Sequence, residues 1–332
     1  MTRFNRLFVL LTTVVLLTSR VMLLAHEFGG HAAPAKLFGG RVTGWYLFMF
    51  AGGRVSYRVP QLDTAQRLVV TLGGIAIELI VGAIAFVLAR RMRERAVASF
   101  CLLAVGTVVV GHGAMYLARG VHYGFGDGAF LAQRLGAARE LVVLAASALA
   151  VGVALGGGRR LARLPASIFR GTPRRVVGAT LLVFACAGLA HGALAVAETR
   201  WFPDPAWVAV MENASVAAAR AELAQRIAEA KQRGEALPSS EEQDRMMEAL
   251  ERARRPWPLD PVLLVAVIAG LIAGVVRGTR DVHAKKTDAD GATDDAADDA
   301  APPTWRTIGR VAGALVVAVG VILLLRALGA SP

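Results

Sequence analysis

The sequence contains little cysteine and little charge. Only two cysteines occur in 332 residues, and both Cys101 and Cys186 lie within apolar runs. This excludes a disulfide framework and a cysteine zinc cluster, so His, Asp or Glu would have to bind any metal ion. Only 19% of the residues are charged, whereas 55% are hydrophobic and the mean hydropathy is +0.51. That balance excludes an ordinary soluble enzyme and a disordered chain.

Lysine is also scarce, since only four of the 37 basic residues are lysines. The arginines cluster beside apolar runs instead of forming a separate basic region. The net charge of +12 therefore indicates a membrane protein that uses arginine to set its orientation, and no nucleic-acid partner is expected. A strong preference for arginine over lysine is common in GC-rich bacterial genomes, so the expected location is a bacterial inner membrane.

Seven apolar runs are long enough, at least marginally, to cross a bilayer, which requires about 20 residues. They cover residues 7–25, 68–89, 97–117, 141–155, 176–196, 262–276 and 308–328. We therefore expect an all-α polytopic membrane protein with about seven transmembrane helices. A cleaved secretory signal is the alternative for the first run, but no small-residue cleavage site follows it.

Three segments lie between the apolar runs. Residues 41–59 contain two β-favouring stretches around a Gly-rich turn and predict a membrane-associated β-hairpin. Residues 201–258 are polar, with apolar residues at helical spacing, and predict an extramembrane helical hairpin. Residues 281–303 are rich in Ala and Asp and predict a disordered acidic linker. The expected units are a membrane core at 1–136, two spans at 137–200, the helical hairpin at 201–258, and two spans with the linker at 259–332.

Basic residues in the short loops indicate the orientation of the chain. They are concentrated at 90–95, 159–175 and 277–286, after the second, fourth and sixth runs, which all end on the same side of the membrane. Together with Arg3 and Arg6 they favour a cytoplasmic N-terminus, although the basic residues between 36 and 58 count against it.

The first apolar run ends in His26-Glu27-Phe28-Gly29-Gly30-His31. Catalytic zinc sites use three protein ligands and leave one position for a water, from which a neighbouring carboxylate removes a proton. Ionisable side chains near a span are costly, so three of them within this hexapeptide indicate a site more readily than packing. His26 and His31 are therefore candidate zinc ligands and Glu27 a candidate general base. The alternative is a set of polar residues at the lipid interface.

The spacing of the two histidines differs from the usual H-E-x-x-H form, in which they are four residues apart. Five steps of about 100° place His26 and His31 roughly 140° apart on an α-helix. A one-residue π-bulge would bring both onto one face, and Gly29-Gly30 is a suitable place for it. The hexapeptide resembles the H-E-x-x-G-H motif of the third class of dipeptidyl peptidases, which bind zinc despite the insertion.

The wider sequence resembles the site-2 proteases, a family of intramembrane zinc metalloproteases. Their first core helix carries H-E-x-G-H followed by small residues, as residues 26–33 do here with Gly30 added, and a β-hairpin entering the membrane comes next. Gly74-Ile75-Ala76-Ile77-Glu78 stands where that family has G-P-x-x-N. Asp127-Gly128 resembles a later D-G element, whose aspartate is the third zinc ligand. The resemblance covers residues 7 to about 136.

The resemblance implies a zinc-dependent endopeptidase in which His26, His31 and Asp127 bind Zn²⁺ and Glu27 activates water. Its substrate would be a transmembrane protein, locally unwound and held extended along an edge of the 41–59 hairpin. In that family the active site faces the cytoplasm, whereas the arginine distribution places it outside. We give more weight to the arginines.

Several residues remain open as alternatives. Glu78, His112 and His122 are candidate ligands or other site residues in place of Asp127, and Glu78 is also a candidate partner for Arg20. The helical hairpin at 201–258 is a candidate binding site for a protein partner.

Two other functions fit the same residues. A non-catalytic membrane scaffold or transporter component would carry a degenerate motif in which the inserted glycine has abolished zinc binding. A zinc-dependent membrane hydrolase acting on a non-peptide substrate would use the same ligands, because ligands do not identify the bond that is cleaved. Measured zinc content separates the first of these from the two hydrolases.

Overall fold

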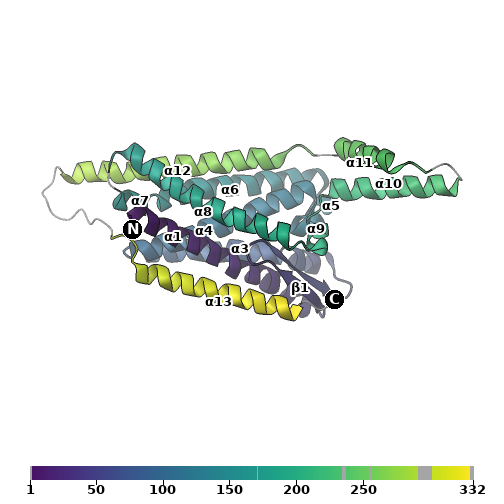
Figure 1. Cartoon of the computed structure of the whole chain (residues 1–332), viewed down its shortest axis with the longest axis horizontal. Coiled ribbons are helices and arrows are strands. Elements are labelled where there is room, and N and C mark those ends of the chain that lie inside the picture. The colour runs from purple at the N-terminus through teal and green to yellow at the C-terminus, as the bar shows by residue number, and fades with distance from the viewer. Residues whose placement is uncertain (1, 170, 234–236, 255, 291–300, 330–332) are drawn as a thin grey trace.

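The computed structural model describes residues 2–169, 171–233, 237–254, 256–290 and 301–329. Within these residues, seven helical segments are long and apolar enough to cross a membrane. The helices are α1 (Arg3–Leu24), α3 (Thr64–Arg91), α4 (Ala96–Tyr123), α6 (Arg139–Leu161), α8 (Pro173–Trp201), α12 (Leu259–Asp290) and α13 (Trp305–Gly329). Six of them contain a predicted apolar run in full, and α1 contains all but the last residue of the run at 7–25. They form one elongated bundle (Figure 1), which confirms the predicted α-helical membrane architecture.

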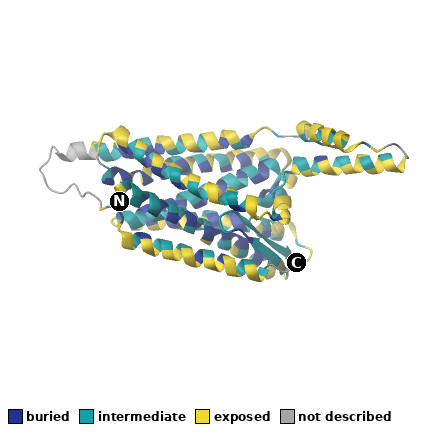
Figure 2. Cartoon of the chain, in the orientation of Figure 1, coloured by how far each residue is buried: buried dark blue, intermediate teal, exposed yellow. Residues whose placement is uncertain are grey.

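Helix α1 lies inside the bundle, in contact with α4, α8 and α13, while α3, α4, α6 and α12 pack in that order. Leu7 and Leu10 of α1 are fully buried. Helix α13 is exposed on its outer side, where Val316 and Val317 are 71% and 66% exposed, and Figure 2 shows the same outward exposure along other outer helices. Apolar side chains that face outward in this way suit a lipid environment.

The predicted β-hairpin is confirmed. Strands β1 (Arg41–Leu47) and β2 (Gly53–Arg58) pair antiparallel, with Trp45 opposite Val55. Strand β1 contacts α13, where the Trp45 indole donates a hydrogen bond to the Leu325 carbonyl at 2.7 Å. Strand β2 instead contacts the segment that follows α1. The hairpin is thus packed on helices.

The predicted helical hairpin at 201–258 is also present. Helices α10 (Ala214–Gln232) and α11 (Ser240–Arg254) lie against one another and extend beyond the bundle as an arm at the end that carries the β-hairpin (Figure 1). Shorter helices complete the connections: α2 (Ala33–Leu37), α5 (Ala129–Arg134), η3 (Gly136–Ala138), α7 (Arg163–Ile168) and α9 (Pro205–Val210).

The structure differs from the sequence prediction in the acidic linker. Helix α12 continues to Asp290, well into the segment predicted as disordered from 281 onward. Alanine and lysine favour a helix, and Arg159 of α6 pairs with Asp281 of this extension at 2.7 Å. Residues 291–300 of the predicted linker lie outside the described residues.

Candidate metal centre

The hexapeptide motif lies in a π-helical segment, η1 (Ala25–Ala32), that continues directly from α1. This confirms the expected π-helical insertion. Its consequence is that the imidazole rings of His26 and His31 face the same side, with their centroids 5.0 Å apart. Five residues of separation are therefore compatible with a shared site.

A close contact between η1 and α3 explains why glycine occupies position 30. A Cβ atom on Gly30 would overlap the backbone of Gly73 and Gly74. The ring of His26 lies against Gly74 in the same way, so a side chain at Gly74 would displace the ring. The glycine-containing element of α3 thus packs directly on the motif.

Asp127 reaches the site because the chain turns back after α4. This helix continues to Tyr123, past the predicted end of the apolar run, and is followed by Gly124 and Gly126 with φ of 70° and 52°. Glycine adopts such angles without the steric cost that other residues have. The short helix η2 (Gly126–Gly128) then places Asp127 Oδ2 3.1 Å from His26 Nε2 and 3.3 Å from His31 Nε2.

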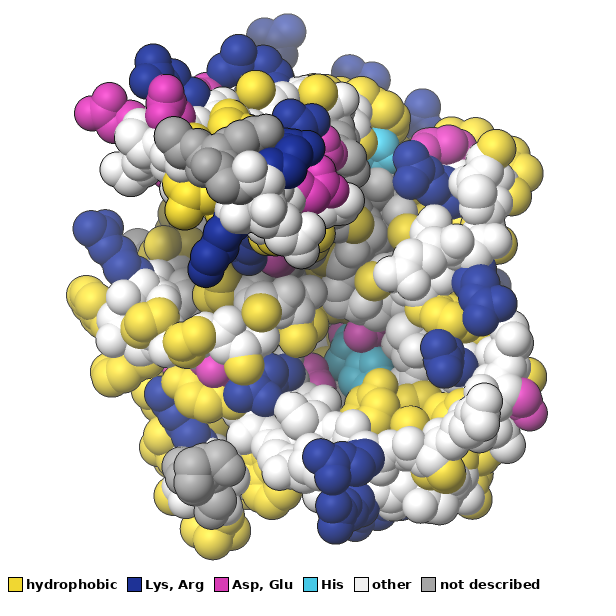
Figure 3. Space-filling model, turned by 90° about the vertical axis from the view of Figure 1, so that its right-hand side faces the viewer, with side chains coloured by type: hydrophobic (Ala, Val, Ile, Leu, Met, Phe, Trp, Pro, Cys, Tyr) yellow, Lys and Arg dark blue, Asp and Glu magenta, His cyan; other side chains and the backbone are white. Residues whose placement is uncertain are grey.

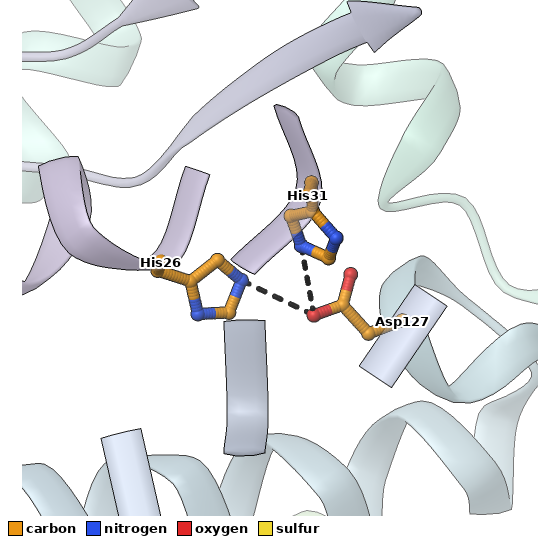
Figure 4. Close-up of side chains that lie close together, drawn as sticks. All are labelled: His26, His31 and Asp127. Atoms are coloured by element: carbon orange, nitrogen blue, oxygen red, sulfur yellow. Dashed lines mark ion pairs between the residues drawn. The ribbon is translucent and has the colours of Figure 1, made fainter. Parts of the chain in front are cut away.

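The three side chains point toward one another from η1 and η2 (Figure 4). One ligand atom from each lies within 4.8 Å of the others. His26 and His31 are buried, at 7% and 6% exposure. Burial raises the pKa of the Asp127 carboxyl, but the neighbouring His26 and His31 side chains outweigh that effect and lower its pKa to about 2. An ionised carboxylate oxygen therefore faces two imidazole nitrogens.

The other ring nitrogens show how the histidines are oriented. His26 Nδ1 lies 2.9 Å from Glu78 Oε1, and His31 Nδ1 lies 2.7 Å from the carbonyl oxygen of Val70. Both partners are acceptors, so each Nδ1 carries a proton and the Nε2 of each ring faces Asp127.

This arrangement fits a bound cation. Asp127 Oδ2 is buried and has no hydrogen bond of acceptable geometry within the described chain. With both Nε2 atoms unprotonated, two nitrogen lone pairs and an anionic oxygen would repel one another, and a cation among them would remove that repulsion. Two histidines and one carboxylate are a zinc ligand set, and histidine ligands that donate their second N–H to a carboxylate or carbonyl are typical of such sites.

Glu78 of α3 lies behind His26 and not in the three-residue group. Its Oε1 contacts His26, and its Oε2 lies 2.9 Å from His112 Nδ1 in α4. Gly113 of α4 leaves the space that this carboxylate occupies. The structure therefore places Glu78 as the residue that orients His26, with His112 one contact further from the centre.

His122, another candidate, is not brought to the centre. It is buried, but its Nε2 lies 2.9 Å from the carbonyl oxygen of Trp257, and its ring lies edge-on to those of Tyr123 and Trp257. These contacts give it a structural role between the end of α4 and the segment before α12.

Glu27 lies beside the centre and under the β-hairpin. It is 6% exposed, and the backbone N–H of Val55 in β2 is among the groups that act on its carboxylate. Tyr57, two residues further along β2, is also close, since burial and then the negative charges of Asp127 and Glu27 raise the pKa of its phenol. Strand β2 therefore passes over the carboxylate expected to act as base.

The end of the bundle that carries the hairpin is hollowed. On this face a hollow has a histidine and acidic side chains at its floor and basic side chains around its rim (Figure 3). A cavity of about 370 Å³ also adjoins the centre between the end of the hairpin and α3, and its lining includes Tyr57, Arg67 and Val70. Val70 links this cavity to the centre through its contact with His31.

Buried charged residues hold the turn of the hairpin from two sides. Arg20 of α1 donates hydrogen bonds of 2.8 to 2.9 Å to three carbonyl oxygens of residues 48–51. Glu198 of α8 accepts hydrogen bonds of 2.5 to 3.2 Å from three backbone N–H groups of the same turn. Arg326 of α13 lies 3.5 Å from Glu198.

These contacts correct one expectation and add a residue that sequence reasoning missed. Arg20 does not pair with Glu78; it binds the hairpin turn. Glu198 was not singled out because the predicted apolar run ends at residue 196. A carboxylate within a helical turn of a membrane span nevertheless indicates a residue with a specific partner.

No family model, curated protein or solved structure matches this chain. The chemistry of the centre itself is therefore what bears on function.

Proposed function

We propose that this protein is a zinc-dependent intramembrane endopeptidase that cleaves transmembrane protein substrates. The observation that carries the proposal is the convergence of His26, His31 and Asp127 with Glu27 beside them, within a bundle of apolar helices. Zinc-dependent peptide hydrolysis within a membrane needs metal ligands, an adjacent carboxylate and a framework of apolar helices.

Each residue has a defined task in the proposed reaction. His26, His31 and Asp127 would hold Zn²⁺, which when bound acts as a Lewis acid and brings the pKa of a water to about 7. Glu27 accepts the proton of the attacking water and later donates it to the leaving amine nitrogen. Glu78 and the Val70 carbonyl keep the proton on each Nδ1, so that both Nε2 atoms remain available as ligands.

Strand β2 is suited to hold the peptide next to Glu27. In the described chain the sheet has only two strands, and β2, which contacts η1, includes Val55, whose backbone N–H is among the groups that act on Glu27. An extended peptide added along this outer edge would bind through main-chain hydrogen bonds, with little demand on its sequence. A helical substrate segment must unwind before it can pair in this way.

The proposal includes a location in a bacterial inner membrane with the centre toward the outside. The N-terminus and α7, which lies within the arginine-rich segment after α6, are at one end of the bundle, and the hairpin is at the other (Figure 1). Arginine-rich loops stay in the cytoplasm, which places the hairpin end on the opposite side.

The test is a comparison of new protein N-termini in membranes from bacteria that express the wild-type chain or the Glu27→Gln variant. New N-termini within or beside transmembrane segments are expected with the wild type and with the control Glu140→Gln, whose side chain is exposed at the start of α6. They should be absent with Glu27→Gln. Identical sets of N-termini at equal zinc content would overturn the endopeptidase assignment while leaving the metal centre in place.

A further inference from the structure

A groove of about 430 Å³ lies on the outside of the bundle between α3 and α6. Both helices pack on α4, where Gly157 of α6 meets Thr107 and Phe86 of α3 meets Gly106. The groove is remote from the metal centre, since Gly74 and Arg90 are about 24 Å apart along α3.

The two ends of this groove differ in chemistry. Arg90 of α3 and Arg160 of α6 line one end. Both are exposed, and neither has a hydrogen bond or ion pair with another described residue. The remaining lining is apolar or glycine, and no acidic side chain contributes to it. The groove therefore presents positive charge at one end and an apolar surface along the rest.

The length of the apolar part matches one leaflet of a bilayer. Ala148 and Arg160 bound the groove along α6 and are about 18 Å apart at 1.5 Å per residue, while half of a hydrocarbon layer of about 30 Å is about 15 Å. Val87 and Leu149 on the two walls are 50% and 42% exposed. The groove thus runs from the level of the arginines to about the middle of the membrane.

Open space exists along the groove for a chain molecule. A Cβ atom on Gly152 or Gly156 would meet nothing within 4 Å. The arginine end lies on the side where the other arginine-rich segments gather, which is where headgroups of that leaflet would be.

We propose that this groove binds one anionic phospholipid. Its phosphate would lie between Arg90 and Arg160, since guanidinium groups bind phosphate oxygens through paired hydrogen bonds. One acyl chain would follow the apolar wall past Gly156 and Gly152. Basic pockets between transmembrane helices are known to bind anionic headgroups. The site is independent of the metal centre and of the proposed reaction.

Native mass spectrometry of the detergent-purified chain tests the proposal, with phosphatidylglycerol and phosphatidylcholine as probes. The wild type should retain one phosphatidylglycerol in preference to phosphatidylcholine. The Arg90→Gln/Arg160→Gln variant should bind phosphatidylglycerol at least about tenfold more weakly, because charged hydrogen bonds are lost. The Gly152→Leu/Gly156→Leu variant should also lose it, because the new side chains fill open space without meeting the protein.

The matched control removes the same charge at the same end but outside the groove, as Arg174→Gln/Arg175→Gln at the start of α8, and should bind like the wild type. Equal thermal unfolding temperatures of all variants show that they are folded. Two results would overturn the proposal: phosphatidylglycerol binding that survives both groove variants, or an equal loss in the control, which would indicate general surface charge.

Discussion

Arg20 and Glu198 bind opposite polar groups of the same peptide turn, the guanidinium holding its carbonyl oxygens and the carboxylate its N–H groups. They come from α1 and α8, and their exposures are 1% and 4%. A charge buried in a membrane protein is costly unless it is paired. Here the turn and the opposite charge supply that pairing, and the result is a hairpin fixed over Glu27.

Arg20 and Glu198 together clamp the hairpin turn. Removing Glu198 is expected to disturb the position of the hairpin without affecting metal binding. Glu198→Ala leaves three backbone N–H groups of the turn without their acceptor and Arg20 without a nearby opposite charge, which should lower the free energy of unfolding by roughly 3–5 kcal/mol. Cleavage of a substrate identified by N-terminus labelling should fall by about 100-fold, as expected for a misplacement of about 1 Å. Zinc content should stay at the wild-type level.

The matched control is Glu212→Ala, which removes a carboxylate that pairs with Arg220 of α10, away from the hairpin turn. It should leave cleavage unchanged. Loss of zinc in Glu198→Ala would show that the clamp supports the metal centre directly, and unchanged cleavage would show that hairpin position does not matter.

The two adjacent glycines of the motif are expected to respond differently to alanine. Gly30→Ala overlaps the backbone of α3, so it should reduce stability by about 1–3 kcal/mol and reduce zinc binding. Gly29→Ala meets only the end of the Ile77 side chain, at 2.9 Å, and should retain zinc. Thermal unfolding and elemental analysis of the two purified variants measure this. Equal zinc in both would contradict the tight contact between η1 and α3.

Glu78 and His112 are expected to differ although both belong to one chain of contacts. Glu78→Gln weakens the hydrogen bond that orients His26, so zinc affinity should fall by about 10- to 100-fold. His112→Ala removes a group one contact further away, whose side chain is 64% exposed, and its effect should be small. Competition with a chromophoric chelator measures both affinities. If His112→Ala lowered the zinc affinity as much as Glu78→Gln does, Glu78 would not be the residue that orients His26 while His112 acts only through it.

Features with local causes were predictable from the sequence. The spans follow from runs of apolar residues, and the π-helical turn follows from five-residue spacing at two glycines, because only a bulge brings His26 and His31 together. The resemblance predicted Asp127 as the third ligand, and the structure brings it to the two histidines. How Asp127 reaches the centre depends on left-handed angles at Gly124 and Gly126, which the glycine-rich sequence permits but does not specify.

Features that depend on distant partners were not predictable. Arg20 binds backbone carbonyls of the hairpin. Every residue has a backbone carbonyl, so the sequence does not indicate which ones a particular side chain will bind. Glu198 lies far along the chain from the same turn. The extension of α12 to Asp290 was misjudged because a segment rich in Ala and Asp suits a helix as well as a linker, and its contact with Arg159 is a tertiary one.

Zinc per chain in detergent-purified protein tests the central claim most directly. Elemental analysis would compare the wild type with His26→Ala, His31→Ala and Asp127→Ala, and with His122→Ala as a buried histidine outside the centre. About one zinc in the wild type and in His122→Ala, lost or sharply reduced in the other three, is the result expected from this site. Folded wild-type protein that was never exposed to chelator yet contains no zinc, or zinc that survives Asp127→Ala, would contradict it.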